Sequence, residues 1–93
     1  MTHTWKVSID LFSVGGVEQE GHVTAAHAVL TTTAGDTLEG YGRARLKPED
    51  EDVPEIGEEL AAARALRELA DKLLRATSDD ISAMEHKRIR LLR

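Results

Sequence analysis

Apolar and polar residues alternate at the start of the chain. Over Trp5–Leu11 every second residue is apolar, and the residues between are polar or charged. A period of two predicts a β-strand with one buried face. Two further strands are predicted at His22–Thr32 and Leu38–Leu46, and the segments that contain Gly15-Gly16 and Ala34–Thr37 separate the three. The first half of the chain therefore predicts a three-stranded sheet.

The middle strand has two faces of similar composition. One face carries Val23, Ala25, His27 and Val29, and the other carries Thr24, Ala26, Ala28 and Leu30. We expect the first set to point toward the core, although this choice buries a histidine.

Two glycines lie on the apolar face of the third strand. Gly40 and Gly42 alternate there with Leu38, Ala44 and Leu46. Glycine weakens a strand but lets another backbone come close. The cluster of Ala61, Ala62, Ala63 and Ala65 on the following helix is the predicted partner of this gap.

A long amphipathic helix is predicted over Pro54–Thr77. Apolar residues recur at three- and four-residue steps, which predicts a stripe that faces the core. The stripe consists of Ile56, Leu60, Ala63, Leu66, Leu69, Ala70, Leu73 and Leu74. Acidic residues in its first turn and basic residues near its end complement the helix dipole.

A short second helix is predicted after Thr77. Thr77 or Ser78 is a suitable N-cap, and the acids of the next turn support a helix start. We expect this helix to end near Glu85 and to be held by Ile81 and Met84. The pattern predicts one α+β domain over residues 1–93, with a β-β-β-α-α core at about 5–85 and a basic tail at 86–93.

Three stretches together resemble a small actinobacterial protein family of unknown function. They are Gly40-x-Gly42-x-Ala44-Arg45-Leu46-x-Pro48, Ile56-Gly57-Glu58-Glu59-Leu60-Ala61-x-Ala63-Arg64-Ala65-Leu66 and Thr77-Ser78-x-Asp80-Ile81. The resemblance spans about Trp5–Met84. It implies a fold like that of the double-stranded-RNA-binding domain, with an antiparallel three-stranded sheet and a helix on one face. The resemblance implies no activity and no functional residues.

Charge argues against duplex RNA as a partner. Residues 49–60 carry seven acidic residues and no basic one, whereas residues 85–93 carry four basic residues and one acidic one. RNA-binding members of this fold present basic residues at the start of the last helix. Here that position carries Glu55, Glu58 and Glu59, which would repel phosphate.

No motif indicates an enzyme, a metal site or a cofactor. The chain has no cysteine. His22 and His27 are five residues apart in one predicted strand and so point to opposite faces. The acidic run Glu49–Asp52 lacks the ligand spacing of a calcium loop, and the glycine pairs lack that of a phosphate loop. We therefore expect a non-enzymatic protein, located in the cytoplasm and without a membrane-spanning segment.

Two surfaces are candidates for interaction. With one helix layer, one face of the sheet stays open, and Phe12, Tyr41, Arg43 and Arg45 fall on it. A thin core favours a homo-oligomer that associates through this face, with a protein partner as a further expectation.

The basic tail is the second candidate. Lys87, Arg88, Arg90 and Arg93 are candidate anion contacts, and weak nucleic-acid binding through them is the alternative function. We favour a frayed, solvated end or an arm that pairs with Glu49–Glu59 of the same or another chain, with an added strand as a further alternative.

Overall fold

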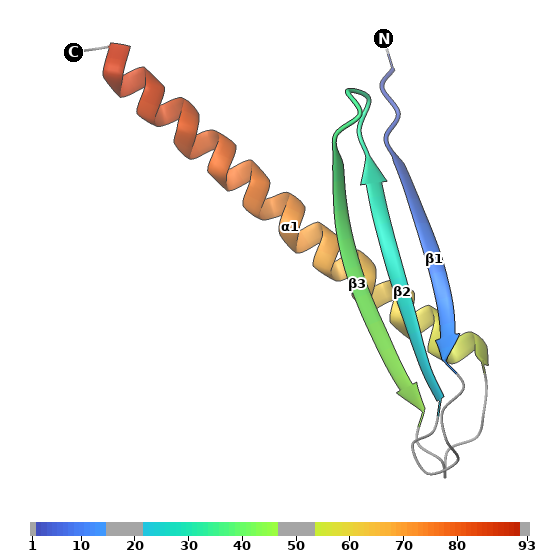
Figure 1. Ribbon diagram of the computed structural model, residues 1–93. Coiled ribbons are helices and arrows are strands. Elements are labelled where there is room, and N and C mark those ends of the chain that lie inside the picture. Colours follow the sequence, from blue (N-terminus) through green and yellow to red (C-terminus); the bar gives the residue numbers. More distant parts are fainter. Residues whose placement is uncertain (1, 15–21, 47–53, 92–93) are drawn as a thin grey trace.

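The fold is a three-stranded antiparallel sheet with one long helix across it (Figure 1). The computed structural model describes residues 2–14, 22–46 and 54–91. The strands β1 (Lys6–Val14), β2 (His22–Thr31) and β3 (Thr37–Leu46) lie in the order β1-β2-β3, and α1 spans Pro54–Leu91. The predicted turn at Gly15-Gly16 and the acidic run Glu49–Asp52 lie outside the described residues.

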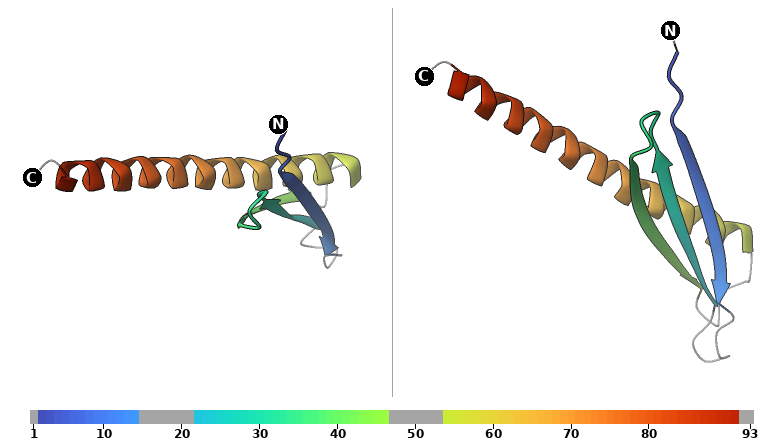
Figure 2. Two further views of the ribbon diagram at one scale, coloured as in Figure 1. Left: turned by 90° about the horizontal axis from the view of Figure 1, so that it is seen from above. Right: turned by 45° about the horizontal axis from the view of Figure 1, so that its top comes forward.

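The two layers confirm the predicted α+β class. Figure 2 shows α1 on one side of the sheet and nothing on the other among the described residues. A tight turn joins β2 to β3: the Thr32 N–H donates to the Asp36 carbonyl at 2.9 Å, and the Gly35 N–H donates to the Thr32 carbonyl at 3.0 Å. Gly35 has φ of 90°, a left-handed conformation that glycine adopts without strain.

The helix lies against the sheet at unusually close range. A Cβ added to Gly40 would overlap the Ala65 carbonyl oxygen and lie 2.7 Å from the Leu69 nitrogen. A Cβ added to Gly42 would overlap the Ala61 carbonyl oxygen. The predicted contact between the strand glycines and the helix alanines is therefore confirmed for Ala61 and Ala65. Glycine on one side and alanine on the other let the two backbones touch.

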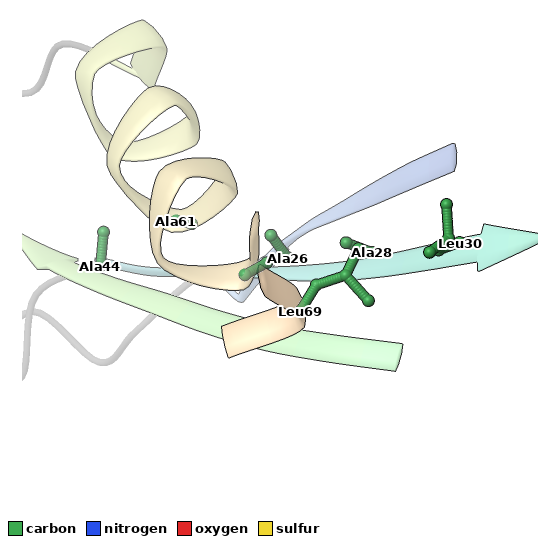
Figure 3. Close-up of a cluster of buried hydrophobic side chains, with 7 residues drawn as sticks. Ala26, Ala28, Leu30, Ala44, Ala61 and Leu69 are labelled. Atoms are coloured by element: carbon green, nitrogen blue, oxygen red, sulfur yellow. The ribbon is translucent and has the colours of Figure 1, made fainter. Parts of the chain in front are cut away.

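The predicted leucine stripe is not the face that α1 buries. Among the described residues of α1, the buried positions are Ala61, Ala65 and Leu69, at four-residue steps, with Leu73 partly buried beside them. Figure 3 shows Ala61 and Leu69 in one cluster with Ala26 and Ala28 of β2. Ile56, Leu60, Ala63, Leu66, Ala70 and Leu74, all assigned to the core from the sequence, are exposed. The stripe prediction was wrong for these six because a leucine between α1 and β3 would hold the two backbones apart.

The inward face of β2 is also the opposite of the predicted one. Thr24, Ala26, Ala28 and Leu30 are buried under α1. The register places Ala28 between Ile9 of β1 and Gly40 of β3, so this set shares the face of the glycines. His27 consequently lies on the open face. A register shift of one residue would turn the other set of β2 side chains toward α1. The close packing at the glycines leaves room only for small side chains, so it selects the register in which Ala26 and Ala28 face the helix.

The predicted second helix does not exist as a separate element. The helix α1 runs without interruption for 38 residues, through the expected break at Thr77. The Thr77 hydroxyl donates to the Leu73 carbonyl, four residues earlier, at 3.0 Å. This hydroxyl satisfies a bond inside the helix instead of capping a new one. The tail is therefore helical as far as Leu91.

The resulting molecule is long and has a small core. Its principal extents are 66 × 30 × 15 Å, and its radius of gyration is 18.9 Å. A compact chain of this length has a radius of gyration of about 12 Å. Five of the seven apolar residues that are buried in the described part of the chain are alanines. Because an alanine buries little apolar area, these residues stabilise the single chain weakly.

The close contact predicts a large effect of single methyl groups. Gly40→Ala and Gly42→Ala should each lower the free energy of unfolding by about 2 kcal/mol or more, because the new Cβ meets helix backbone that cannot retreat locally. Urea unfolding measures the change. Gly35→Asn is the comparison, since its Cβ meets nothing within 4 Å and only the strain of a side chain at a φ of 90° remains; because asparagine tolerates positive φ better than most residues, its cost should be smaller than at Gly40 or Gly42. Equal losses at all three positions would contradict the close packing.

Candidate functional site

The open face of the sheet carries the four residues predicted for self-association. Phe12 and Tyr41 are each about half exposed, and Arg43 and Arg45 are exposed beside them. The register pairs Phe12 with Ala25 and Ala25 with Arg43, so three strands contribute to one surface. The structure thus brings the predicted residues onto one face, and their role in association stays a prediction.

Tyr41 already has partners within its own chain. Its ring stacks on His27, with centroids 4.5 Å apart and an interplanar angle of 7°. The Tyr41 hydroxyl donates to Glu39 at 3.5 Å, and His27 Nε2 lies 3.4 Å from the other Glu39 oxygen. His27 Nε2 is buried and has no hydrogen-bond partner among the described residues, so this last contact is a close approach without a formed hydrogen bond. Tyr41, on the open face, therefore already has a stacking partner and a hydrogen-bond partner within its own chain.

Side chains of α1 cap the outer edge of β3. The Tyr41 N–H donates to Glu68 Oε1 at 3.3 Å, and Arg64 Nη1 donates to the Arg43 carbonyl at 2.6 Å. Lys72 holds Glu68 in place through an ion pair of 3.3 Å. Free backbone groups on an edge strand invite pairing with another chain. Arg64 and Glu68 block that route at the middle of β3.

On the helix side of the sheet, α1 covers β1 less than it covers β2 and β3. The helix contacts β3 and β2 extensively and β1 only slightly, because it crosses the sheet on a diagonal (Figures 1 and 2). Val7 and Leu11 pair with the buried Leu30 and Ala26, so they lie on the helix side of β1, and they remain 48% and 42% exposed. Trp5, just before β1, is 51% exposed. Apolar residues therefore remain accessible on this face of the sheet beside α1.

The distal half of α1 leaves the sheet altogether. Figure 1 shows the helix continuing past β3, away from the three strands. Every described side chain from Thr77 to His86 is exposed. Leu74, Ile81 and Met84 are 67%, 52% and 73% exposed. This part of the helix therefore carries apolar side chains that are largely exposed to solvent.

These exposed residues continue a regular pattern that the sequence interpretation divided. Steps of three and four connect Ala63, Leu66, Ala70, Leu73, Thr77, Ile81 and Met84 without a break. Such spacing is typical of a helix that packs on another helix. The assumed helix end at Thr77 concealed the pattern, although its continuous period was already visible in the sequence.

Opposite charges lie at the two ends of α1. Glu55, Glu58 and Glu59 are exposed at its start. Lys87, Arg88 and Arg90 belong to its last turns, and Arg93 lies outside the described residues. Glu59 and Arg88 are 29 residues apart on one helix, which is about 43 Å. The basic end therefore cannot pair with the acidic start of its own helix. Anion binding by the tail stays a prediction.

Two further properties concern metals and membranes. Within residues 2–14, 22–46 and 54–91, no three histidine or acidic side chains lie close enough together to hold a metal ion. In the same part of the chain, no helix has both the length and the apolar character needed to span a membrane.

The fold is that of a small α+β protein, and its notable surface features are exposed apolar side chains and the charged ends of α1. Comparison with known families makes the assignment specific. A model of the Rv2632c-like family matches residues 3–90, and the chain belongs to that family. The resemblance noted in the sequence is thereby confirmed for the family, while the likeness to double-stranded-RNA-binding domains remains a prediction.

Relatives and a solved structure agree with this assignment. The chain is 43% identical over 88 residues to the uncharacterized protein Mb1767 of Mycobacterium bovis, covering 95% of this chain and 86% of that protein. It is 48% identical over 71 residues to the uncharacterized protein Rv2632c of Mycobacterium tuberculosis, covering 76% and 75%. The crystal structure of Rv2632c is similar with a TM-score of 0.66 at 44% identity, covering 87% of this chain and 90% of that one. Because both proteins are described as uncharacterized, their names assign no activity.

The capped edge predicts a specific effect on solubility. Glu68→Ala removes the acceptor of the Tyr41 N–H and should increase aggregation at high protein concentration, because the middle of β3 becomes available for pairing. Static light scattering during incubation measures this change. Asp71→Ala removes the same charge from an exposed helix position and should leave the scattering unchanged. Equal scattering from both variants would show that Glu68 does not protect the edge.

Proposed function

We propose that this protein is a small non-enzymatic interaction protein that acts as a homo-oligomer. The observation that carries the proposal is the distal half of α1, which presents Leu74, Ile81 and Met84 to solvent. In proteins most helix stability comes from packing of an apolar face, so a helix that leaves its own core gains stability from a partner surface. The small alanine-rich core gives the single chain little stability to spare.

A second copy fits this surface in charge as well as in apolarity. The acidic start of α1 and its basic end are opposite in sign and cannot meet within one helix. An isologous interface around a two-fold axis lets each end meet the opposite end of the other copy. A single surface of one chain is then complementary to itself.

The absence of catalytic side-chain groupings in the sequence motifs supports a non-enzymatic role. The chain has no cysteine, and none of its serine or threonine residues lies in a nucleophile-elbow sequence. A chain of 93 residues with three aromatic residues also has little material for a deep substrate cavity.

Light scattering on a sizing column tests the proposal. The expected mass at tens of micromolar protein is at least twice the chain mass of 10.2 kDa. Because the molecule is elongated, elution volume alone would overstate its size, and the scattering mass is the decisive reading. A mass of one chain at high micromolar concentration would overturn the proposal.

The open face of the sheet is the alternative association surface. Phe12→Ser combined with Tyr41→Ser removes its two exposed aromatic rings and changes no residue of α1. We expect this variant to keep the mass of the unaltered protein, since Tyr41 is already stacked on His27. A monomeric mass for a folded variant would instead assign association to the open face.

A further inference from the structure

We infer that α1 pairs side by side and antiparallel with α1 of a second copy, through the flank that carries Leu66, Leu74, Ile81 and Met84. This inference rests on the proposed self-association and specifies its surface, direction and register.

The flank is identified by the contacts of α1 with the sheet. Arg64 and Glu68 reach the outer edge of β3, so they mark the flank of α1 that faces that edge. Leu66 and Leu73 lie on the opposite flank, about half a turn away. Leu73 packs partly against the core, and Leu66 stays 40% exposed. This second flank faces toward β1, where Trp5 and Val7 are also exposed.

The same flank continues along the distal helix. Ala63, Leu66 and Ala70 lie above the sheet, and Thr77, Ile81 and Met84 lie beyond it, all on one side of α1 because they are spaced by three and four residues. The part over the sheet and the part beyond it have similar lengths. An antiparallel partner therefore places its distal half beside the sheet-bound half of the first copy.

One register of the two helices gives a suitable residue pair at each turn of the contact. Centred between Leu73 and Leu74, antiparallel pairing places Leu66 beside Ile81 of the second copy. It also pairs small residues with larger ones, as cores require: Ala63 with Met84, and Ala70 with Thr77. The same register places Glu59 beside Arg88 of the second copy. Charge pairs that flank an apolar seam set the orientation of paired helices.

Parallel pairing would have the opposite effect on charge. It would place Glu55, Glu58 and Glu59 of two copies side by side, and likewise the basic ends. Like charges at that distance repel one another. The charge distribution of α1 therefore selects the antiparallel direction.

Disulfide cross-linking tests the register directly. The chain has no cysteine, so introduced thiols are the only ones present. In a variant carrying Leu66→Cys and Ile81→Cys, the two thiols of one chain are about 22 Å apart along the helix and cannot join. Mild oxidation of the folded dimer should convert most of this variant to a covalent dimer on a non-reducing gel.

Three controls accompany this experiment. Leu66→Cys alone and Ile81→Cys alone should remain uncross-linked, because like positions of the two copies lie about 22 Å apart. The pair Leu66→Cys and Ser82→Cys should cross-link at least tenfold more slowly, because one residue further turns the thiol by about 100°. Cross-linking of a single variant with itself would indicate parallel pairing and overturn the inference.

Charge reversal tests the same register without thiols. Glu59→Arg and Arg88→Glu should each weaken dimerisation about tenfold, because each creates two like-charge contacts around the two-fold axis. The combined variant should restore association to within about threefold of the unaltered protein. This measurement decides the matter if the cysteine variants fail to fold.

The outcomes separate the inference from the proposed function. An unaltered protein that is monomeric by light scattering contradicts both. A dimeric protein in which Leu66→Cys with Ile81→Cys does not cross-link, or in which the charge reversals are not mutually compensating, contradicts only the helix pairing.

Discussion

The contact between two strand glycines and two helix alanines controls the rest of this structure. Gly40 and Gly42 have no side chain, so Ala61 and Ala65 rest directly on the backbone of β3. This contact decides which side of α1 faces the sheet, because only the alanine side fits the space. It also selects the inward face of β2, since Ala26 and Ala28 lie beside the same glycines. The larger apolar residues of α1 are thereby turned outward.

The sequence predicted the elements better than the faces. The three strands, the segments that separate them and the glycine–alanine contact could all be predicted, because period-two alternation and small residues are local signals. The leucine stripe could not be assigned correctly, since two apolar sides exist on α1 and hydrophobicity ranks the leucine side first. The short distance between α1 and β3 reverses that ranking, because only the alanine side fits. This distance is set by glycines in a strand some twenty residues earlier in the chain. The same long-range contact places His27 on the open face. No local pattern in β2 indicates this placement.

The continuous helix shows a second limit of local signals. Thr77, Ser78 and the following acids are good capping residues, yet the Thr77 hydroxyl bonds the Leu73 carbonyl and the helix continues. Among the candidate sites, the four open-face residues were placed correctly on one surface, because strand alternation determines them. The distal flank of α1 was missed as a surface, because its residues were divided between a core stripe and a separate short helix. In the continuous helix, the apolar flank and the opposite terminal charges lie on one element, and both support the proposed pairing with a second copy.

Hydrogen exchange along α1 tests this account most directly. The sheet-bound part near Ala61–Leu73 should be protected at every concentration, since the single chain packs it. The distal amides beyond Thr77 should be protected only above the concentration at which light scattering shows association, because they depend on a second copy. Fast distal exchange in a protein that is fully associated would contradict the account, and so would equal distal protection in the monomer and the oligomer.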